Sequence, residues 1–215
     1  MKTTLYLGTD PTQFEARGRV RGHLIHYPVI KIVPRSLEDA ELKQAYDQLE
    51  EFTHFIFTSK NAVKIFFQHL TSTEVLKTKT LIAIGKVTAA HLAMKSFSPH
   101  HIAQDETQEG VVQLLRGLPL ENSYIFLPRS SISRPILVQF FEERGIRYLA
   151  CDLYDTQVQI LDPKPDLDLI DEIVFTSPST VQAFLKIFGM LPKDKKLIAI
   201  GSITEAALNA TVRIN

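Results

Sequence analysis

The sequence predicts an α/β fold in which two doubly wound parallel-sheet domains, joined by a two-stranded linker, are encoded by an internally duplicated chain of 215 residues. Two observations predict it: two sequence blocks recur in the same order, and each block passes from a short apolar run into a helical pattern. Strands that alternate with helices over short connections are typical of parallel sheets with right-handed crossovers.

The repeat consists of two matched pairs of segments. FIFTSKNAV at 55–63 is echoed 118 residues later by IVFTSPSTV at 173–181, and LIAIGKVT at 81–88 recurs 116 residues later as LIAIGSIT at 197–204. Matched blocks in one order indicate duplication. The difference of two residues between the offsets is what a change in the length of a surface loop gives.

Each block reads as a buried strand followed by an amphipathic helix. The strands are short apolar runs bounded by Ser, Thr or Gly, as expected where helices cover both faces of a flavodoxin-like or Rossmann-like sheet. In the first helix, the apolar residues fall at i, i+3, i+4 and i+7, and the second helix repeats that spacing. These positions are Val63, Phe66, Phe67 and Leu70, and then Val181, Phe184, Leu185 and Phe188.

Two further β-α-β units fix the path of the chain. The first has strands at 4–8 and 23–27 around a helix near 11–21, and the second has strands at 124–127 and 147–153 around a helix at 132–144. The first unit precedes its repeat block, whereas the second follows its own. We therefore expect the chain to begin in one domain, build the other and return. The predicted ranges are 1–33 with 158–215 for domain 1, 36–150 for domain 2, and 29–35 with 151–160 for the linker strands.

Composition and charge exclude several classes of protein. The chain has 24 basic and 24 acidic residues and is 45% hydrophobic, so we expect a folded protein without general affinity for nucleic acid or for anionic membranes. Its only cysteine, Cys151, cannot form an internal disulfide, which fits a reducing compartment. No secretory signal and no run of 18 apolar residues is present, so the predicted location is cytoplasmic.

The standard cofactor and metal motifs are missing from the sequence. It contains no GxGxxG, no GxxxxGK[ST], no GxSxG and no HExxH. His23 and His26 stand three residues apart, but no Cys or carboxylate partner has metal-ligand spacing. The residues therefore give no sign of a metal site or of a nucleotide cofactor.

Hydroxyl groups recur where the predicted strands end. One interpretation is that they cap helices, because Ser and Thr accept hydrogen bonds from the first free N–H groups of a helix. They also suit a site in which helix N-termini bind carboxylates or phosphates, in a cleft formed where two such sheet edges face each other. The two interpretations are compatible. The residues concerned are Ser59, Thr88, Ser177, Thr204 and the predicted turn Pro128-Arg129-Ser130-Ser131.

An ordered set of segments resembles the uroporphyrinogen-III synthase family over nearly the whole chain. No single segment is specific to this family, but the order and spacing of the segments are. The segments are FTSKNAV at 57–63, AIGKVTA at 83–89, EGVVQLL at 109–115, LPRSSISRPILVQFFEERGI at 127–146, LYDT at 153–156, FTSPSTV at 175–181 and AIGSITEAAL at 199–208.

The resemblance implies a bilobal enzyme of haem biosynthesis with a two-stranded linker. Members convert hydroxymethylbilane to uroporphyrinogen III with loss of water and inversion of ring D, and they need no cofactor. The reaction passes through an azafulvene and a spirocyclic pyrrolenine. We accordingly expect a monomeric lyase whose partner is this small molecule with eight carboxylates.

The resemblance also assigns candidate site residues. Tyr154, in the Y-x-T segment, corresponds to the candidate general acid, although a strand tyrosine can equally pack between the domains. The family positions that line the cleft correspond to Ser59, Thr88 and Ser177, and the repeat adds Thr204. Substrate carboxylates could pair with Arg129 beside Ser130, and with Arg134, unless these arginines are simply solvated at a helix start.

A different class of function shares most of these features. A non-enzymatic two-lobed protein that closes on a carboxylated metabolite would have the same fold and the same hydroxyl-lined cleft. It would have no need of Tyr154, so the role of this tyrosine separates the two hypotheses.

Overall fold

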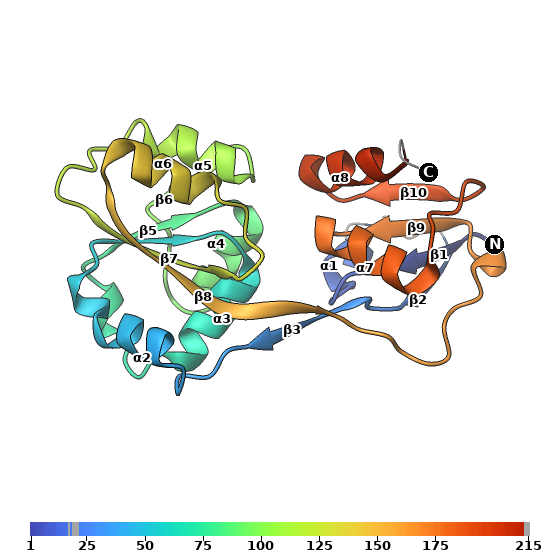
Figure 1. Cartoon of the computed structure of the whole chain (residues 1–215), viewed down its shortest axis with the longest axis horizontal. Coiled ribbons are helices and arrows are strands. Elements are labelled where there is room, and N and C mark those ends of the chain that lie inside the picture. The colour runs from blue at the N-terminus through green and yellow to red at the C-terminus, as the bar shows by residue number, and fades with distance from the viewer. Residues whose placement is uncertain (17, 19–21, 213–215) are drawn as a thin grey trace. The chain divides into compact units, whose positions relative to one another are not determined.

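The computed structural model describes residues 1–16, 18 and 22–212, and it has an α/β fold with parallel sheets (Figure 1). The chain divides into two compact units. Unit 1 comprises Met1–Lys31 with Thr156–Asn215, and unit 2 comprises Ile32–Asp155. Unit 2 is therefore continuous in sequence, whereas the chain enters unit 1 twice.

Unit 1 contains a four-stranded sheet in the order β10-β9-β1-β2, and its neighbouring strands are parallel. Helices α7 and α8 supply the apolar residues that cover one face, and α1 contributes to the other. In chain order the elements are β1 (Thr3–Tyr6), α1 (Thr12–Ala16), β2 (His23–His26), β9 (Glu172–Phe175), α7 (Pro178–Phe188), β10 (Lys196–Ala199) and α8 (Ser202–Val212).

Unit 2 is built on a six-stranded sheet in the order β3-β8-β7-β4-β5-β6. Helices α2, α3 and α4 pack on one face, and α5 and α6 pack on the other (Figure 1). The elements are β3 (Ile30–Pro34), α2 (Ala40–Asp47), β4 (His54–Phe57), α3 (Lys60–His69), β5 (Thr80–Ala83), α4 (Lys86–Ala93), β6 (His101–Ile102), α5 (Gln108–Leu115), β7 (Tyr124–Ser130), α6 (Ile136–Arg144) and β8 (Arg147–Val158).

Buried strand residues alternate between the two faces, as the pleat of a strand requires. In β4, Phe55 and Phe57 point into the core under α3 and α4, while Ile56 points into the core under α5 and α6. Both faces of the strand are apolar because both are covered by helices. The continuous FIF and IVF runs of the sequence follow from this double burial.

The repeated blocks adopt the same local structure in the two units. Ser59 caps α3 with φ −161° and ψ 156°, and Ser177 caps α7 with φ −164° and ψ 162°. The strand phenylalanine before each cap packs edge-on against a helix phenylalanine. The ring centroids are 5.4 Å apart for Phe57 and Phe66, and 5.5 Å apart for Phe175 and Phe184.

The strands β3 and β8 pair along the segments in which the chain passes between the units. The Arg35 N–H donates to the Leu153 carbonyl at 2.9 Å, and the Gln159 N–H donates to the Val29 carbonyl at 2.8 Å. Partners that run in opposite order identify an antiparallel pair. The predicted strand at 147–153 and the overlapping linker strand predicted at 151–160 correspond to one continuous strand of 12 residues, β8.

The predicted turn Pro128–Ser131 is wrong. The strand β7 continues through Arg129 to Ser130, because the long neighbour β8 offers hydrogen-bonding partners as far as Tyr154. The register shifts between Arg129 and Ser130, so Ser130 pairs with Tyr154 rather than with Leu153. Arg129 and Ser130 therefore belong to a strand end and not to a helix start.

Two predicted helices begin or end elsewhere. Helix α6 begins at Ile136 rather than at 132, since Pro135 disfavours helical backbone at the residue before it, Arg134. Arg134 thus precedes the helix instead of lying in its first turn. The helix predicted near 11–21 is observed as α1, and positions 17 and 19–21 of that range lie outside the described residues. Across the described part of the chain, no helix is long and apolar enough to cross a membrane.

Candidate active site

The sheet of unit 2 has a change of chain direction between β4 and β7. From β4 the chain proceeds to β5 on one side, and from β7 it proceeds to β8 on the other. The helix after β4 packs on one face and the helix after β7 packs on the opposite face. In open α/β sheets the loops that diverge at such a point leave a crevice at the carboxyl ends of the strands, and ligands bind there.

Three of the predicted site residues meet at this edge. The Tyr154 hydroxyl lies 3.0 Å from Ser59 Oγ, and it is also hydrogen-bonded to the side chain of Ser130. The three residues come from β8, from the cap of α3 and from the end of β7. Residues almost 100 positions apart in sequence thus form one cluster of hydroxyl groups.

The environment of Tyr154 keeps its hydroxyl protonated. The side chain is only 5% exposed and packs in the core beneath α3 and α4. Burial raises the pKa of Tyr154, and the hydrogen bonds from Ser59 and Ser130 lower it by less than burial raises it. A neutral phenol that is held by two hydroxyls can donate a hydrogen bond to a ligand oxygen without first gaining a proton.

Ser59 serves both as a helix cap and as a partner of Tyr154. Its Oγ accepts a hydrogen bond from the Ala62 N–H at 3.0 Å. Capping uses a lone pair of the oxygen, so the hydroxyl proton stays available for a second partner. The two interpretations of this serine from the sequence are therefore compatible in the geometry.

The bulge at the end of β7 places Ser130 beside Tyr154. The N–H of Ser131 donates to the Tyr154 carbonyl at 3.1 Å, directly after the register shift. A bulge turns the following side chains and ends regular pairing, and such irregularities occur often at functional sites. Neither residue type nor spacing in the sequence reveals this shift.

The other predicted hydroxyls lie at equivalent places in their own units. Thr88 is in the first turn of α4, after β5, and is 4% exposed. In unit 1, Ser177 caps α7 and shares a capping box with Thr180, while Thr204 is 3% exposed in the first turn of α8. Each of these three residues, like Ser59, thus occupies the start of a helix that follows a parallel strand.

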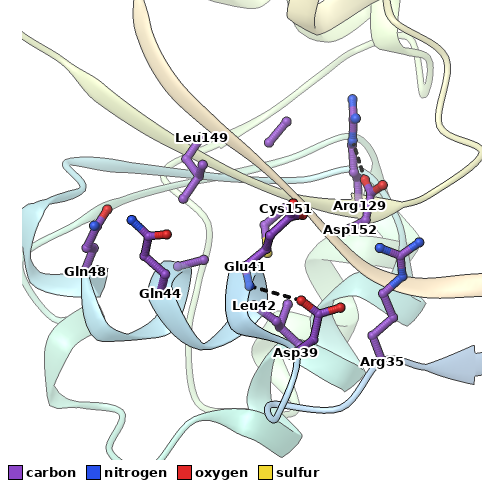
Figure 2. Close-up of a pocket in the computed structure, with 12 residues that line it drawn as sticks. Arg35, Asp39, Glu41, Leu42, Gln44, Gln48, Arg129, Leu149, Cys151 and Asp152 are labelled. Atoms are coloured by element: carbon purple, nitrogen blue, oxygen red, sulfur yellow. Dashed lines mark hydrogen bonds and ion pairs between the residues drawn. The ribbon is translucent and has the colours of Figure 1, made fainter.

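Arg129 and Arg134 are ion-paired with carboxylates of this chain. Arg134 and Glu109 form two hydrogen bonds of 2.6 Å and 2.7 Å, which lower the pKa of Glu109 to about 2. The Nε of Arg129 donates to Asp152 at 2.8 Å (Figure 2). A substrate carboxylate that bound these guanidinium groups would therefore have to share them with the carboxylates of Asp152 and Glu109.

Arg129 also lines a cavity of about 380 Å³ between α2 and β8 (Figure 2). Arg35 and the buried thiol of Cys151 lie in the same lining. Burial is the main cause that raises the pKa of Cys151 to about 12, with the Asp152 charge as a second cause. The thiol is therefore protonated at neutral pH and is a poor nucleophile.

Sequence reasoning missed two interactions that support the cluster. Asp155, the residue after Tyr154, accepts two hydrogen bonds from Arg35 across the β3–β8 pair. Gln108 is buried, and its amide donates to Ser133 and accepts from the Leu137 N–H, so it holds the loop after β7. In the sequence, only the predicted pairing of the linker strands indicated the first of these interactions, because that pairing brings Arg35 near Asp155.

The described residues show no arrangement suited to a metal ion. No group of three or more His, Cys, Asp or Glu side chains among them could hold one. The cluster itself consists of hydroxyl groups, which can donate hydrogen bonds, accept them and orient a ligand.

A family model described as uroporphyrinogen-III synthase HemD matches residues 12–212. The chain belongs to the uroporphyrinogen-III synthase family. It is an enzyme of tetrapyrrole biosynthesis, and the resemblance noted in the sequence is confirmed.

Relatives in this family are distant in sequence but similar in fold. A protein of Methanothermobacter thermautotrophicus, provisionally named a uroporphyrinogen-III synthase, is 29% identical over 180 residues, which are 76% of this chain and 71% of that protein. A crystal structure of a mutant uroporphyrinogen III synthase from Thermus thermophilus has a TM-score of 0.70 at 20% identity, covering 99% of this chain and 90% of that one. The synthetase of Helicobacter pylori has a TM-score of 0.62 at 19% identity, with full coverage of both chains.

The matching serine caps offer a paired test of the cluster. Replacing either Ser59 or Ser177 by Ala should lower the free energy of unfolding by about 1 kcal/mol, because each variant loses a helix cap. Only Ser59→Ala should raise the pKa of Tyr154 further, since it removes a hydrogen bond that lowers this pKa. Urea unfolding measures the first effect, and an alkaline titration of ¹³Cζ-labelled tyrosine followed by NMR measures the second. An equal tyrosine shift in both variants would contradict the contact.

Proposed function

We propose that this chain converts hydroxymethylbilane to uroporphyrinogen III, with inversion of ring D and loss of water, and that Tyr154 carries the chemical step. The observation that supports this most is the buried Tyr154 hydroxyl, 3.0 Å from Ser59 Oγ and bonded to Ser130 at the carboxyl edge of the sheet. It lies where the fold leaves a crevice for a ligand.

The reaction requires a proton or a strong hydrogen bond at the hydroxyl that leaves the substrate. Tyr154 retains its proton because burial raises its pKa. It donates to the departing oxygen while Ser59 and Ser130 stabilise the negative charge that develops on the phenol. The departing hydroxyl takes the proton of Tyr154 and leaves as water, and the proton released from the attacked ring carbon at the final ring closure returns to the Tyr154 phenolate.

Geometry determines which isomer forms. The linear tetrapyrrole can close without inversion in the absence of an enzyme, so the site must hold the chain in the fold that leads through the spirocyclic intermediate. Orientation of reacting groups is a large contribution to catalysis. We assign this role to the Ser and Thr residues at the helix starts and to the adjacent N–H groups, which suit carboxylates. They are Ser59, Thr88, Ser177 and Thr204.

We also propose that the two units are duplicated domains with the predicted ranges 1–33 with 158–215 and 36–150, joined by linker strands at 29–35 and 151–160. The repeated serine caps and the repeated phenylalanine pairs support a common origin. The antiparallel pairing of β3 with β8 supports the two-stranded linker.

Product analysis tests the proposed function. The chain is incubated with freshly prepared hydroxymethylbilane, and the products are oxidised and resolved as isomers. We expect the type III isomer at a rate proportional to enzyme concentration. Type I isomer alone, formed at the uncatalysed rate, would defeat the proposal and favour a non-enzymatic binding protein.

A further inference from the structure

Asp155 follows Tyr154 directly and is the last residue of unit 2. Its carboxylate accepts two hydrogen bonds from Arg35, at 3.0 Å and 3.3 Å, and one from the hydroxyl of Ser131. Arg35 comes just after β3 and Ser131 comes just after β7, and these are the two strands that flank β8 in the sheet. One carboxylate on β8 therefore joins three neighbouring strands.

This carboxylate is charged at neutral pH. The hydrogen bonds from Arg35 and from Ser131 lower the pKa of Asp155, and they outweigh the opposing effect of burial. A charged acceptor forms stronger hydrogen bonds than a neutral one. The side chains of Arg35 and Asp155 are 32% and 37% exposed, so the ion pair itself contributes little to the stability of the fold.

The contacts of Asp155 lie beside the register shift at the end of β7. As far as Arg129 the strands β7 and β8 pair residue by residue, but Ser130 then pairs with Tyr154. The N–H of Ser131 donates to the Tyr154 carbonyl at 3.1 Å. Ser131 is thus attached to β8 twice, by its N–H at Tyr154 and by its hydroxyl at Asp155.

This attachment determines where the side chain of Ser130 points. At a bulge the regular ladder is interrupted, so neighbouring contacts decide the direction of the side chains. Ser130 precedes Ser131, and its side chain is hydrogen-bonded to the Tyr154 hydroxyl. The ring of Tyr154 is fixed by packing in the core. A change at Asp155 therefore alters which partner meets the tyrosine hydroxyl, while the ring stays in place.

We propose that Asp155 is a positioning residue for the reaction: bound to Arg35 and Ser131, it holds the bulge so that Ser130 stays on the Tyr154 hydroxyl. This inference rests on the proposed function, because it takes Tyr154 as the donor to the leaving hydroxyl. Asp155 acts through the two serines and not on the substrate itself. Its loss weakens the stabilisation of the charge that develops on the phenol.

The kinetic test uses Asp155→Asn and Arg35→Gln, with Glu51→Gln as the matched control. Glu51 forms an ion pair of 3.4 Å with Arg147 at the opposite end of β8. Asp155→Asn and Arg35→Gln should each lower kcat by about 5–10-fold and leave KM within about twofold, because one hydrogen bond to the reacting phenol is lost. Glu51→Gln should leave both parameters within about twofold of wild type.

The pKa of Tyr154 separates positioning from a structural or purely electrostatic role. It is measured by alkaline titration of ¹³Cζ-labelled tyrosine, and Tyr154→Phe assigns the resonance. Asp155→Asn should raise this pKa, because the Ser130 hydrogen bond that lowers it is lost. Removal of a nearby negative charge would by itself lower the pKa of a phenol, so the direction of the shift discriminates.

Three results overturn the proposal. The first is an unchanged or lowered pKa of Tyr154 in Asp155→Asn, and the second is an equal shift in Glu51→Gln. The third is a KM that rises as much as kcat falls, because a positioning residue for the chemical step changes kcat. If the wild-type chain forms no type III isomer yet Asp155→Asn raises the pKa of Tyr154, the proposed function fails and the positioning of Ser130 by Asp155 stands.

Discussion

Replacement of Tyr154 by Phe is expected to lower turnover by about 100-fold and to change KM by less than about threefold. The substitution keeps the buried ring and removes only the hydroxyl that contacts Ser59 and Ser130. Substrate carboxylates would still bind, but the leaving hydroxyl would lose its hydrogen-bond donor. Steady-state assays that resolve the product isomers measure both parameters.

Tyr148→Phe is the matched control for this prediction. Tyr148 lies on the same strand, and its hydroxyl donates to Glu142 at 2.9 Å, away from the cluster. Its loss should leave turnover within about twofold of wild type. If Tyr154→Phe also retains wild-type turnover, the tyrosine has no part in the chemical step, and its hydroxyl only stabilises the end of β8.

Replacement of Phe126 by Ala is expected to lower the free energy of unfolding of unit 2 by about 3–5 kcal/mol. Phe126 has no exposed surface, and its ring centroid lies 4.9–6.4 Å from those of four aromatic neighbours. Removal of the Phe126 ring leaves a cavity that the neighbouring aromatic rings, which are rigid, fill poorly. The neighbours are Phe52, Phe55, Phe66 and Tyr46.

Urea unfolding followed by circular dichroism measures this loss, which is a large share of the roughly 5–15 kcal/mol that stabilises a typical domain. Phe126→Leu is the control, because it retains much of the buried volume and should lose less than half as much. A midpoint for Phe126→Ala equal to that of wild type would show that this aromatic group does not form the centre of the unit 2 core.

Local sequence patterns were sufficient to predict the elements of the repeat. The apolar runs at 55–57 and 173–175 are strands, and the serines that follow them cap helices, because burial on both faces and free helix N–H groups leave few alternatives. These features depend on residues a few positions apart. The α/β fold with parallel sheets, which was predicted from the same local patterns, is also confirmed.

The errors arose where distant strands decide the structure. Nothing near Arg129 or Ser130 indicates that β7 continues past Leu127, because its partner β8 is more than 20 residues away in sequence and shifts register there. The sequence left open whether Arg129 pairs with a substrate carboxylate or is solvated, whereas in the structure Asp152 on the neighbouring strand binds it. Pairing of this kind depends on register, which single residues do not encode.

The candidate site was predictable residue by residue but not as a cluster. The sequence indicated each of Tyr154, Ser59 and Ser130 as a candidate. Their contact, however, depends on the order of β8, β7 and β4 in the sheet and on the register shift between Arg129 and Ser130. Gln108 could not be found, since a buried glutamine that holds a loop has no spacing signature.

The most direct test of the central claim is an anaerobic crystal structure of the chain with uroporphyrinogen III bound. The account predicts that the Tyr154 Oη lies within about 3.2 Å of the product, or is joined to it by one water, beside the inverted ring. It also predicts product carboxylates at the starts of α3 and α4. A product bound with the Tyr154 hydroxyl still enclosed by protein and out of its reach would contradict the account.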